Sequence, residues 1–194
     1  MFVDVFRHAD YNPRELQTLK KGIMAGSSCP PPLCDRLVKE LGMYDFGIGY
    51  GSTELSPLTT FSRLSEPPME RINSVGYAFY HTEVCVVDKN GQVVERGEKG
   101  EVCSRGANVM KGYWNDEKET KQSIDQDGWY HTGDVGIMHS NGSLEICGRI
   151  TDGIIRGGEN IYPAEVEAYL FKHPDISTVQ ELTVYYGRLQ TRTV

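Results

Sequence analysis

The spacing of hydrophobic residues in the first third of the chain predicts two kinds of element. Short apolar runs at 2–6, 23–25 and 46–50 are typical of buried strands. Between the last two runs, leucine and valine recur at helical spacing from residue 33 to residue 41. A strand, a helix and a strand at this spacing imply parallel pairing. We therefore expect residues 1–75 to form a partial parallel α/β subdomain.

Local signals support both ends of this helix. Pro30, Pro31 and Pro32 precede it, and proline is tolerated in a first helical turn. Gly42 follows it and suits the left-handed conformation in which many helices end. A further helical turn is expected around Leu16 and Leu19.

The pattern changes near residue 75 to short strands joined by tight turns. Asn90-Gly91 and Asn141-Gly142 are typical of hairpin turns. Strands are expected at 83–87, 92–94, 101–104 and 144–147. One helix interrupts them, capped by Asn115 and running to about Ser123. We expect residues 76–150 to form a small antiparallel, β-barrel-like subdomain.

A third unit is expected over residues 151–194. Gly157-Gly158 predicts a tight loop, and Pro163 predicts the start of a helix that ends before His173-Pro174. This unit has the pattern of the start of a small C-terminal α+β domain. The chain as a whole is therefore predicted to combine α/β and α+β parts.

Charge and cysteine content narrow the classes of function. The formal net charge of −7 disfavours a general nucleic-acid binder or a binder of anionic membranes. No pair of the five cysteines has C-x-x-C spacing, which argues against a disulfide framework or a zinc site and fits a reducing compartment. We expect no transmembrane segment and no targeting segment in this chain. No pattern indicates the oligomeric state.

One short string combines the residue types that bind nucleotides. Tyr50-Gly51-Ser52-Thr53-Glu54 follows an expected parallel strand, where α/β sheets place ligands. A tyrosine can stack on a purine, a glycine admits close backbone approach, and a carboxylate can hold Mg²⁺. The hydroxyl groups can donate to phosphate oxygens. Taken alone, the string is more typical of a strand end followed by an ordinary turn.

Two later strings add further candidate ligands. In the string 129–134, Asp134 can accept two hydrogen bonds from a ribose diol, or it can bond its own backbone in a turn. In Gly148-Arg149, the guanidinium of Arg149 suits a phosphate or ribose, or a surface ion pair.

Together and in this order, the strings resemble consecutive signatures of the adenylate-forming superfamily. That superfamily includes acyl-CoA synthetases, beetle luciferases and the adenylation domains of peptide synthetases. Other matching strings are Gly100-Glu101-Val102-Cys103-Ser104-Arg105-Gly106, Gly112-Tyr113-Trp114 and the segment from Gly157 to Glu167. The resemblance covers about residues 1–180, and the segment 155–163 is most similar to mitochondrial medium-chain acyl-CoA ligases.

The resemblance implies an acid–thiol ligase with three small-molecule substrates. A medium-chain fatty acid would react with ATP to give an acyl-adenylate, and coenzyme A would then displace AMP. Mg²⁺ would accompany the ATP. A mitochondrial matrix location is also implied. Two alternatives stay open: a non-catalytic AMP-binding or regulatory fragment, and an enzyme that passes the adenylate to a carrier protein or to oxygen.

The resemblance also implies roles for individual residues. Thr53 and Glu54 would be the catalytic pair, with Thr53 contacting phosphate and Glu54 binding Mg²⁺. The nucleotide and coenzyme A would be held by Gly26, Ser27, Tyr50, Gly51, Ser52, Thr53, Asp134, Arg149, Gly157 and Gly158. Within that set, Tyr50 would pack on adenine, beside the Gly26-Ser27 loop, and Asp134 would hold the ribose. Gly157-Gly158 would line the pantetheine channel.

The sequence departs from the superfamily pattern in several places. No Gly/Ser/Thr-rich phosphate loop ending in lysine precedes the opening run, and the superfamily's catalytic lysine would lie beyond Val194. The segment 181–194 also loses the resemblance, and Thr151 stands where lysine or aspartate is usual at the domain hinge. We therefore expect an internal fragment that is inactive or weakly active alone.

Overall fold

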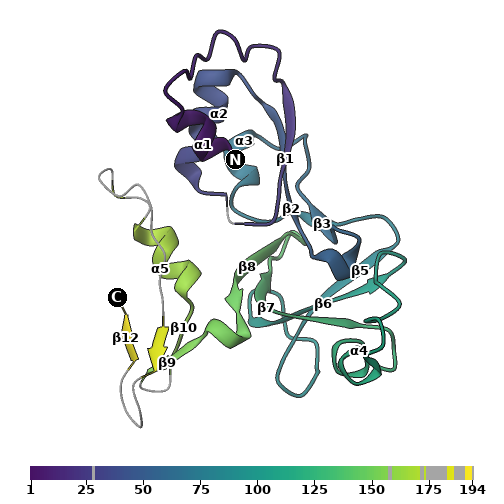
Figure 1. Cartoon of the computed structure of the whole chain (residues 1–194). Coiled ribbons are helices and arrows are strands. Elements are labelled where there is room, and N and C mark those ends of the chain that lie inside the picture. Colours follow the sequence, from purple (N-terminus) through teal and green to yellow (C-terminus); the bar gives the residue numbers. More distant parts are fainter. Residues whose placement is uncertain (28, 157–158, 171–172, 174–182, 186–190, 194) are drawn as a thin grey trace.

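The computed structural model of the protein describes residues 1–27, 29–156, 159–170, 173, 183–185 and 191–193. Two four-stranded sheets make up most of the described chain, and a smaller unit follows them (Figure 1). Within these residues, no helix is long and apolar enough to cross a membrane.

The first sheet has the strand order β1-β2-β3-β4. Its strands are β1 (Lys21–Met24), β2 (Asp45–Tyr50), β3 (Thr60–Phe61) and β4 (Tyr77–Ala78). β1 and β2 pair in parallel, and the other two pairs are antiparallel. The predicted strand–helix–strand unit with parallel pairing is therefore confirmed.

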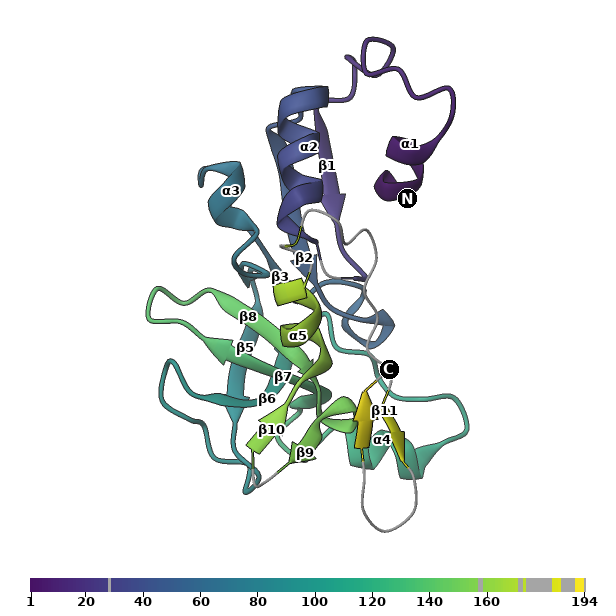
Figure 2. The same ribbon diagram turned by 90° about the vertical axis from the view of Figure 1, so that its left-hand side faces the viewer.

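The helix of that unit, α2 (Pro31–Leu41), covers the first sheet. It lies along β1 in both ribbon views (Figures 1 and 2). It follows Pro30, and it ends at Gly42 with φ +61°, as the sequence predicts. Its buried face packs with β2 into one core, whose fully buried side chains include Cys34, Leu37, Met43 and Phe46. A short helix, α3 (Pro68–Arg71), lies beside α2 and β2.

The N-terminal apolar run forms a helix, α1 (Phe2–Arg7), so the predicted strand is wrong. Phe6 is buried, its ring meets Tyr11 edge-on at 5.3 Å, and the Arg36 guanidinium of α2 lies 4.0 Å from its centroid. Phe2 packs against the same core, because residues four apart share a helix face. Such a short apolar run fits the hydrophobic spacing of a helix and that of a strand. The residues against which it packs therefore decide between the two.

The second sheet is an open antiparallel meander, and the barrel-like form predicted for it is wrong. Its strands run in order: β5 (Thr82–Val87), β6 (Lys99–Gly106), β7 (Tyr130–Met138) and β8 (Leu144–Arg149). Among the described strands, β8 does not pair with β5, so the sheet does not close into a barrel. Main-chain hydrogen bonds from Val75 to Leu144 (2.7 Å) and from Leu144 to Gly76 (2.8 Å) connect it to the first sheet.

Several local predictions in this region need correction. The segment 92–94 forms only an isolated bridge between Val93 and Val87. The helix α4 (Glu117–Ser123) is capped by Asp116, whose carboxylate accepts from the Glu119 amide at 2.9 Å, and not by Asn115. Residues 13–18 form consecutive turns in place of a helical turn at Leu16 and Leu19.

The third unit begins after β8. It contains the 3₁₀ turn η2 (Ile150–Asp152), β9 (Ile154–Arg156), β10 (Glu159–Ile161), the predicted helix α5 (Pro163–Leu170), β11 (Thr183–Tyr185) and β12 (Thr191–Thr193). Tyr162 packs with Val135 and Cys147 and so joins this unit to the second sheet. The Gly157-Gly158 loop and most of 181–194 lie outside the described residues. The boundaries at 75 and 150 remain our proposal.

Candidate functional site

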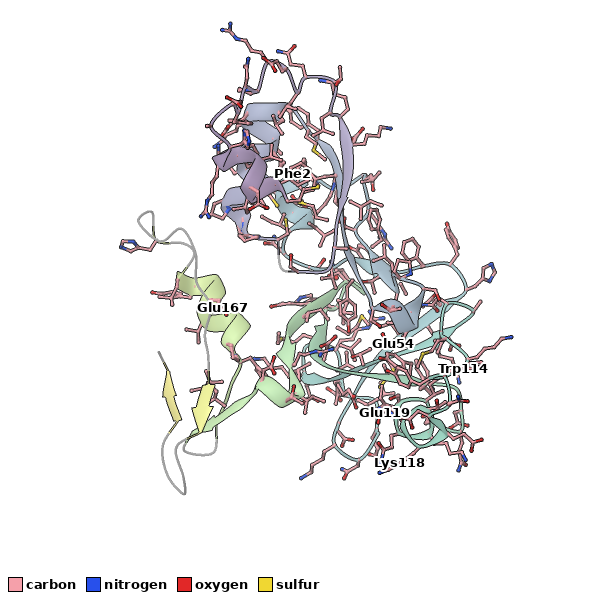
Figure 3. The ribbon with its side chains drawn as sticks, viewed as in Figure 1. Phe2, Glu54, Trp114, Lys118, Glu119 and Glu167 are labelled. Atoms are coloured by element: carbon pink, nitrogen blue, oxygen red, sulfur yellow. The ribbon has the colours of Figure 1, made fainter. Side chains whose placement is uncertain are left out.

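A cavity of about 450 Å³ lies between the end of β2 and the second sheet, with α4 on one side. Its volume falls in the range of about 300–1,000 Å³ that is usual for small-molecule sites. The lining residues are Tyr50, Ser52, Glu54, Glu101, Tyr113, Glu119, Gln122, Ser123, Tyr130, His131, Thr132, Gly133, Asp134 and Arg149. Glu54 and Glu119 come from the 3₁₀ turn η1 (Thr53–Leu55) and from α4, and Figure 3 labels both in this region.

Three candidate ligands meet through their side chains on one wall of this cavity. The Tyr50 hydroxyl donates to Asp134 Oδ2 at 2.7 Å, and Arg149 Nε donates to Asp134 Oδ1 at 3.0 Å. Asp134 on β7 and Arg149 on β8 are direct cross-strand partners. Asp134 and Arg149 therefore lie together beside Tyr50. Asp134 lies within β7 and not at its end.

A bulge in β7 presents Asp134 to the cavity. Residues 132–134 stand opposite the single residue Val102, and Gly133 adopts φ +70°. The Thr132 hydroxyl donates to Val102 O at 2.8 Å and accepts from the Asp134 amide at 3.0 Å. The Gly133 amide donates to Glu101 Oε1 at 3.1 Å. Side chains therefore pair the amides that the bulge removes from the strand ladder.

The charge states on this wall follow from its burial and contacts. Burial raises the pKa of Tyr50, and the Asp134 carboxylate raises it further, so the phenol remains a donor. The hydrogen bond to Asp134 raises the pKa of Arg149, which remains a cation. A carboxylate has about four acceptor positions. Tyr50 and Arg149 use two of those on Asp134, which leaves acceptor capacity for a ligand with paired hydroxyl groups.

Glu54 supplies a second anchor across the cavity. Its carboxylate accepts from the Tyr113 hydroxyl at 2.9 Å, and its main-chain oxygen accepts from the Met110 amide at 2.8 Å. The nearby Ser52 hydroxyl lowers the pKa of Glu54, and its own amide and Tyr113 add to the effect. Ser52 Oγ is buried and has no well-formed hydrogen bond to any described residue. A buried hydroxyl of this kind beside an ionised carboxylate suits a phosphate oxygen or a hydrated cation.

Comparison with known proteins identifies the family. Residues 1–114 match the family described as AMP-binding enzyme. The chain belongs to this family of AMP-binding enzymes. It is 44% identical to the putative acyl-CoA synthetase YngI of Bacillus subtilis (strain 168) over 95% of this chain and 34% of that relative. It is 40% identical to the human mitochondrial medium-chain acyl-CoA ligase ACSF2, over 97% of this chain and 31% of that relative.

Solved structures of adenylate-forming enzymes share the fold of this chain. The o-succinylbenzoate coenzyme A synthetase MenE of Bacillus subtilis, in complex with ATP and a magnesium ion, is 34% identical with a TM-score of 0.74. That match covers 87% of this chain and 34% of MenE. The amide bond synthetase McbA of Marinactinospora thermotolerans is 28% identical with a TM-score of 0.84, over 99% of this chain and 38% of McbA. The chain spans about a third of the length of the relatives it matches.

Other residues predicted to bind the nucleotide or coenzyme A lie away from the cavity or outside the described residues. Thr53 is exposed on η1 and does not line the cavity. Gly26 and Ser27 are exposed in the loop after β1 and do not line it either. Gly157 and Gly158 lie outside the described residues. The structure therefore brings together Tyr50, Ser52, Glu54, Asp134 and Arg149 from the predicted set.

Sequence reasoning assigned no role to several residues that shape this cavity. Glu101, Thr132 and His131 hold the bulge, and Tyr113 orients Glu54. These residues lie inside the sequence strings that resemble the superfamily. That resemblance is the signal by which they could have been found. Their contacts depend on the register of β6 and β7, which the strings themselves do not contain.

Gly51 is required by the fold of the loop itself. A Cβ at this position would lie 2.2 Å from Pro57 O and 2.7 Å from Leu58 Cα, both backbone atoms. We expect Gly51→Ala to lower the free energy of unfolding by about 1–3 kcal/mol, because overpacking against backbone is relieved only by moving it. Urea unfolding measures this change. Gly49→Ala is the matched control, because its Cβ would meet side-chain atoms and no backbone among its nearest neighbours: the Leu58 methyl groups at 3.1 Å and the Phe61 ring at 3.3 Å. An equal loss in both variants would contradict this account.

Proposed function

We propose that this chain carries the nucleotide site of a fatty acid–CoA ligase that acts on medium-chain fatty acids. In the first step, a carboxylate oxygen bonds to the α-phosphorus of ATP and the bond from that phosphorus to pyrophosphate breaks. In the second, the thiol of coenzyme A loses its proton and attacks the acyl carbon, and AMP leaves. The observation that carries the proposal is the Asp134 carboxylate, held between Tyr50 and Arg149 in a cavity that also contains Glu54.

Each wall of the cavity suits one part of the nucleotide. The Tyr50 ring would pack on adenine near the Gly26-Ser27 loop, and Asp134 with Arg149 would bind the ribose hydroxyls. The segment Gly51-Ser52-Thr53 would meet the phosphates, where the Ser52 hydroxyl, which has no well-formed hydrogen bond to a described residue, could donate. Gly157-Gly158 would line the path of pantetheine. Neither step requires a protein nucleophile, so these residues would act by positioning and by electrostatic stabilisation.

The charges on the cavity explain why the triphosphate would need Mg²⁺. Four carboxylates line it, from Glu54, Glu101, Glu119 and Asp134. Among the described lining residues, Arg149 is the one with a permanent positive charge. Mg²⁺ held by Glu54 would neutralise phosphate charge, and the Tyr113 hydrogen bond holds that carboxylate in place. ATP binding by this chain is therefore expected to depend strongly on Mg²⁺.

The same charge balance supports a second candidate function, which is AMP binding without catalysis. AMP carries fewer phosphate charges than ATP, and a single guanidinium among four carboxylates matches it better. In this case the 194-residue chain would retain AMP through Tyr50, Asp134 and Arg149 but would not complete the ligase reaction. Binding and turnover measured on the same sample separate the two functions.

We predict that the 194-residue chain makes acyl-CoA about 10⁴–10⁶-fold more slowly than a full-length relative assayed beside it. The loss of one positioned donor typically lowers a rate by about 10²–10³, and the cavity lacks both a glycine-rich phosphate loop and a lysine among its described lining residues. The assay contains ATP, Mg²⁺, a medium-chain fatty acid and coenzyme A, and product is quantified by mass spectrometry. Turnover within tenfold of the relative would contradict the prediction.

Nucleotide binding is tested separately by calorimetry with AMP, with GMP as the control for the base. Saturable binding of AMP and none of GMP would support the adenine site, and equal binding of both would overturn it.

Replacing coenzyme A by other acceptors tests whether the ligase reaction requires its thiol. A mitochondrial location is proposed from the names of the bovine and human relatives, with the matrix as the compartment that the superfamily resemblance implies, and fractionation of cells that express the chain tests it.

A further inference from the structure

Three potential metal ligands form a row across the second sheet, next to the nucleotide cavity. Cys85 on β5 is the direct partner of Cys103 on β6, and Cys103 is the direct partner of His131 on β7. Direct partners on neighbouring strands point to the same face of a sheet. Glu101 precedes Cys103 by two residues, so it also shares this face. Strand pairing thus gathers two thiols, an imidazole and a carboxylate.

The distances among Cys103, His131 and Glu101 approach those of a coordination sphere, and strand pairing places Cys85 beside Cys103. Cys103 Sγ lies 3.4 Å from His131 Nδ1, which in turn lies 2.9 Å from Glu101 Oε2. One ligand atom from each of these residues lies within 4.8 Å of the others. With metal–ligand bonds of about 2.0–2.3 Å, tetrahedral geometry places ligand atoms about 3.3–3.8 Å apart. Cys103 and His131 already meet that requirement, and His131 and Glu101 would have to move apart by a few tenths of an ångström to meet it.

The surroundings of the cluster match those of known metal sites. His131 Nε2 faces the Asp125 carboxylate at 3.7 Å, and metal-binding histidines usually direct the second ring nitrogen to such a partner. Glu101 Oε1 already accepts from the Gly133 amide, so only Oε2 is available for a metal and the bulge stays supported. Cys103 is buried, whereas the side chains of His131 and Glu101 are 29% and 22% exposed on the cavity side, which provides an entry path.

The geometry points to a binding site for one zinc-class divalent cation, formed by Cys85, Cys103, His131 and Glu101. Thiolate and imidazole ligands select such an ion over Mg²⁺, which prefers oxygen ligands. On binding, each thiol loses its proton to solvent and forms a sulfur–metal bond, while His131, with its ring proton on the Nε2 that faces Asp125, binds the ion through the Nδ1 lone pair. The ion would join β5, β6 and β7 beneath the cavity. Its site is separate from the Mg²⁺ position proposed at Glu54, and it does not depend on the proposed ligase activity.

Cobalt(II) is the probe for this site, because thiolate ligation of cobalt gives intense charge-transfer absorption and a tetrahedral site gives strong visible bands. The reduced 194-residue chain, in a phosphine reductant without other thiols, is titrated with cobalt and then with zinc. We expect saturation at one equivalent, bleaching by zinc, and release of protons measured by calorimetry in two buffers of different ionisation enthalpy.

Substitutions test which residues bind the cobalt ion that gives the absorption. The double variant Cys85→Ser and Cys103→Ser is expected to lose the thiolate absorption. The matched control is Cys29→Ser with Cys34→Ser, which removes another thiol pair, whose sulfur atoms lie 3.1 Å apart, one on α2 and one in the segment before it. Asp125→Asn keeps the backbone contacts of its Oδ1 and is expected to weaken binding by about 10–100-fold, as the loss of an outer carboxylate usually does.

The two cysteine double variants distinguish the proposed site from binding elsewhere on the chain. Loss of absorption in the Cys85 and Cys103 variant, with retention in the Cys29 and Cys34 control, supports the site. The reverse pattern would overturn it, as would a spectrum without thiolate bands or binding that is insensitive to both pairs. Circular dichroism of each variant without metal verifies folding. If the double variant does not fold, His131→Gln replaces it, and undiminished cobalt affinity in that variant would equally overturn the proposal.

Discussion

Replacing Asp134 by alanine is expected to weaken AMP binding by a factor of roughly 10²–10⁴, the equivalent of two hydrogen bonds to a charged group at about 1.5–3 kcal/mol each. The proposed ribose contact uses the acceptor positions of this carboxylate that Tyr50 and Arg149 leave unoccupied. Its removal also deprives the Tyr50 hydroxyl and the Arg149 guanidinium of their common partner. Calorimetric titration with AMP measures the change in affinity.

Two variants distinguish loss of the ligand contact from loss of the fold. Asp134→Asn keeps the shape of the side chain, so it is expected to fold well and to bind AMP with intermediate affinity. Asp127→Asn removes an exposed carboxylate from the turn before β7 and should leave binding unchanged. If Asp134→Ala unfolds in urea like the unaltered chain and binds AMP equally well, the ribose role of Asp134 is wrong.

Replacing Arg71 by methionine is expected to lower the free energy of unfolding by at least about 3 kcal/mol, because a buried acceptor left unpaired costs about 1–3 kcal/mol. Arg71 is only 4% exposed on α3. Its guanidinium donates to four main-chain carbonyl oxygens at 2.7–2.8 Å, those of Tyr44, Phe46, Leu64 and Glu66. These bonds connect α3 to the start of β2 and to the loop after β3. Methionine fills the space but pairs none of the four.

Equilibrium urea unfolding, followed by circular dichroism, measures this loss. Arg71→Lys keeps the positive charge but lacks the planar guanidinium group. Its stability should therefore fall between those of the unaltered chain and Arg71→Met. Arg63→Met is the matched control. Arg63 is exposed and lies over the Tyr77 ring at 3.7 Å, a contact that contributes about 0.5–1 kcal/mol at such sites. Equal losses for Arg71→Met and Arg63→Met would show that the buried carbonyl contacts contribute little.

The expected effects of Asp134→Ala and Arg71→Met are large because, in each case, one side chain forms hydrogen bonds to several partners that are distant in sequence. Asp134 joins Tyr50, which lies 84 residues away, and Arg71 reaches Tyr44, which lies 27 residues away. The superfamily strings included Asp134 as a ligand but contained no information on how β7 would present it. Arg71 lies outside every string, and its sequence neighbours give no sign that a charged residue is buried there.

The sequence by itself determined those features that depend on a few neighbouring residues. Prolines and Gly42 define the ends of α2 by their own backbone preferences, and Asn141-Gly142 sets the turn between β7 and β8 in the same way. The order of the strings placed the chain in its family, because each string retains the side chains that face the proposed nucleotide. These local signals can be recognised without knowing which residues they contact in the folded chain.

Only the tertiary structure decided the features that depend on what packs where. The apolar run at 2–6 fits a strand or a helix, and contact with α2 selects the helix. The spacing of the cysteines argued against a metal site, but strand register brings Cys85, Cys103 and His131 together across 46 residues of chain. A bulge of three residues opposite Val102 places Asp134 in the cavity. Pairing across strands acts between residues distant along the chain, so local sequence patterns do not contain it.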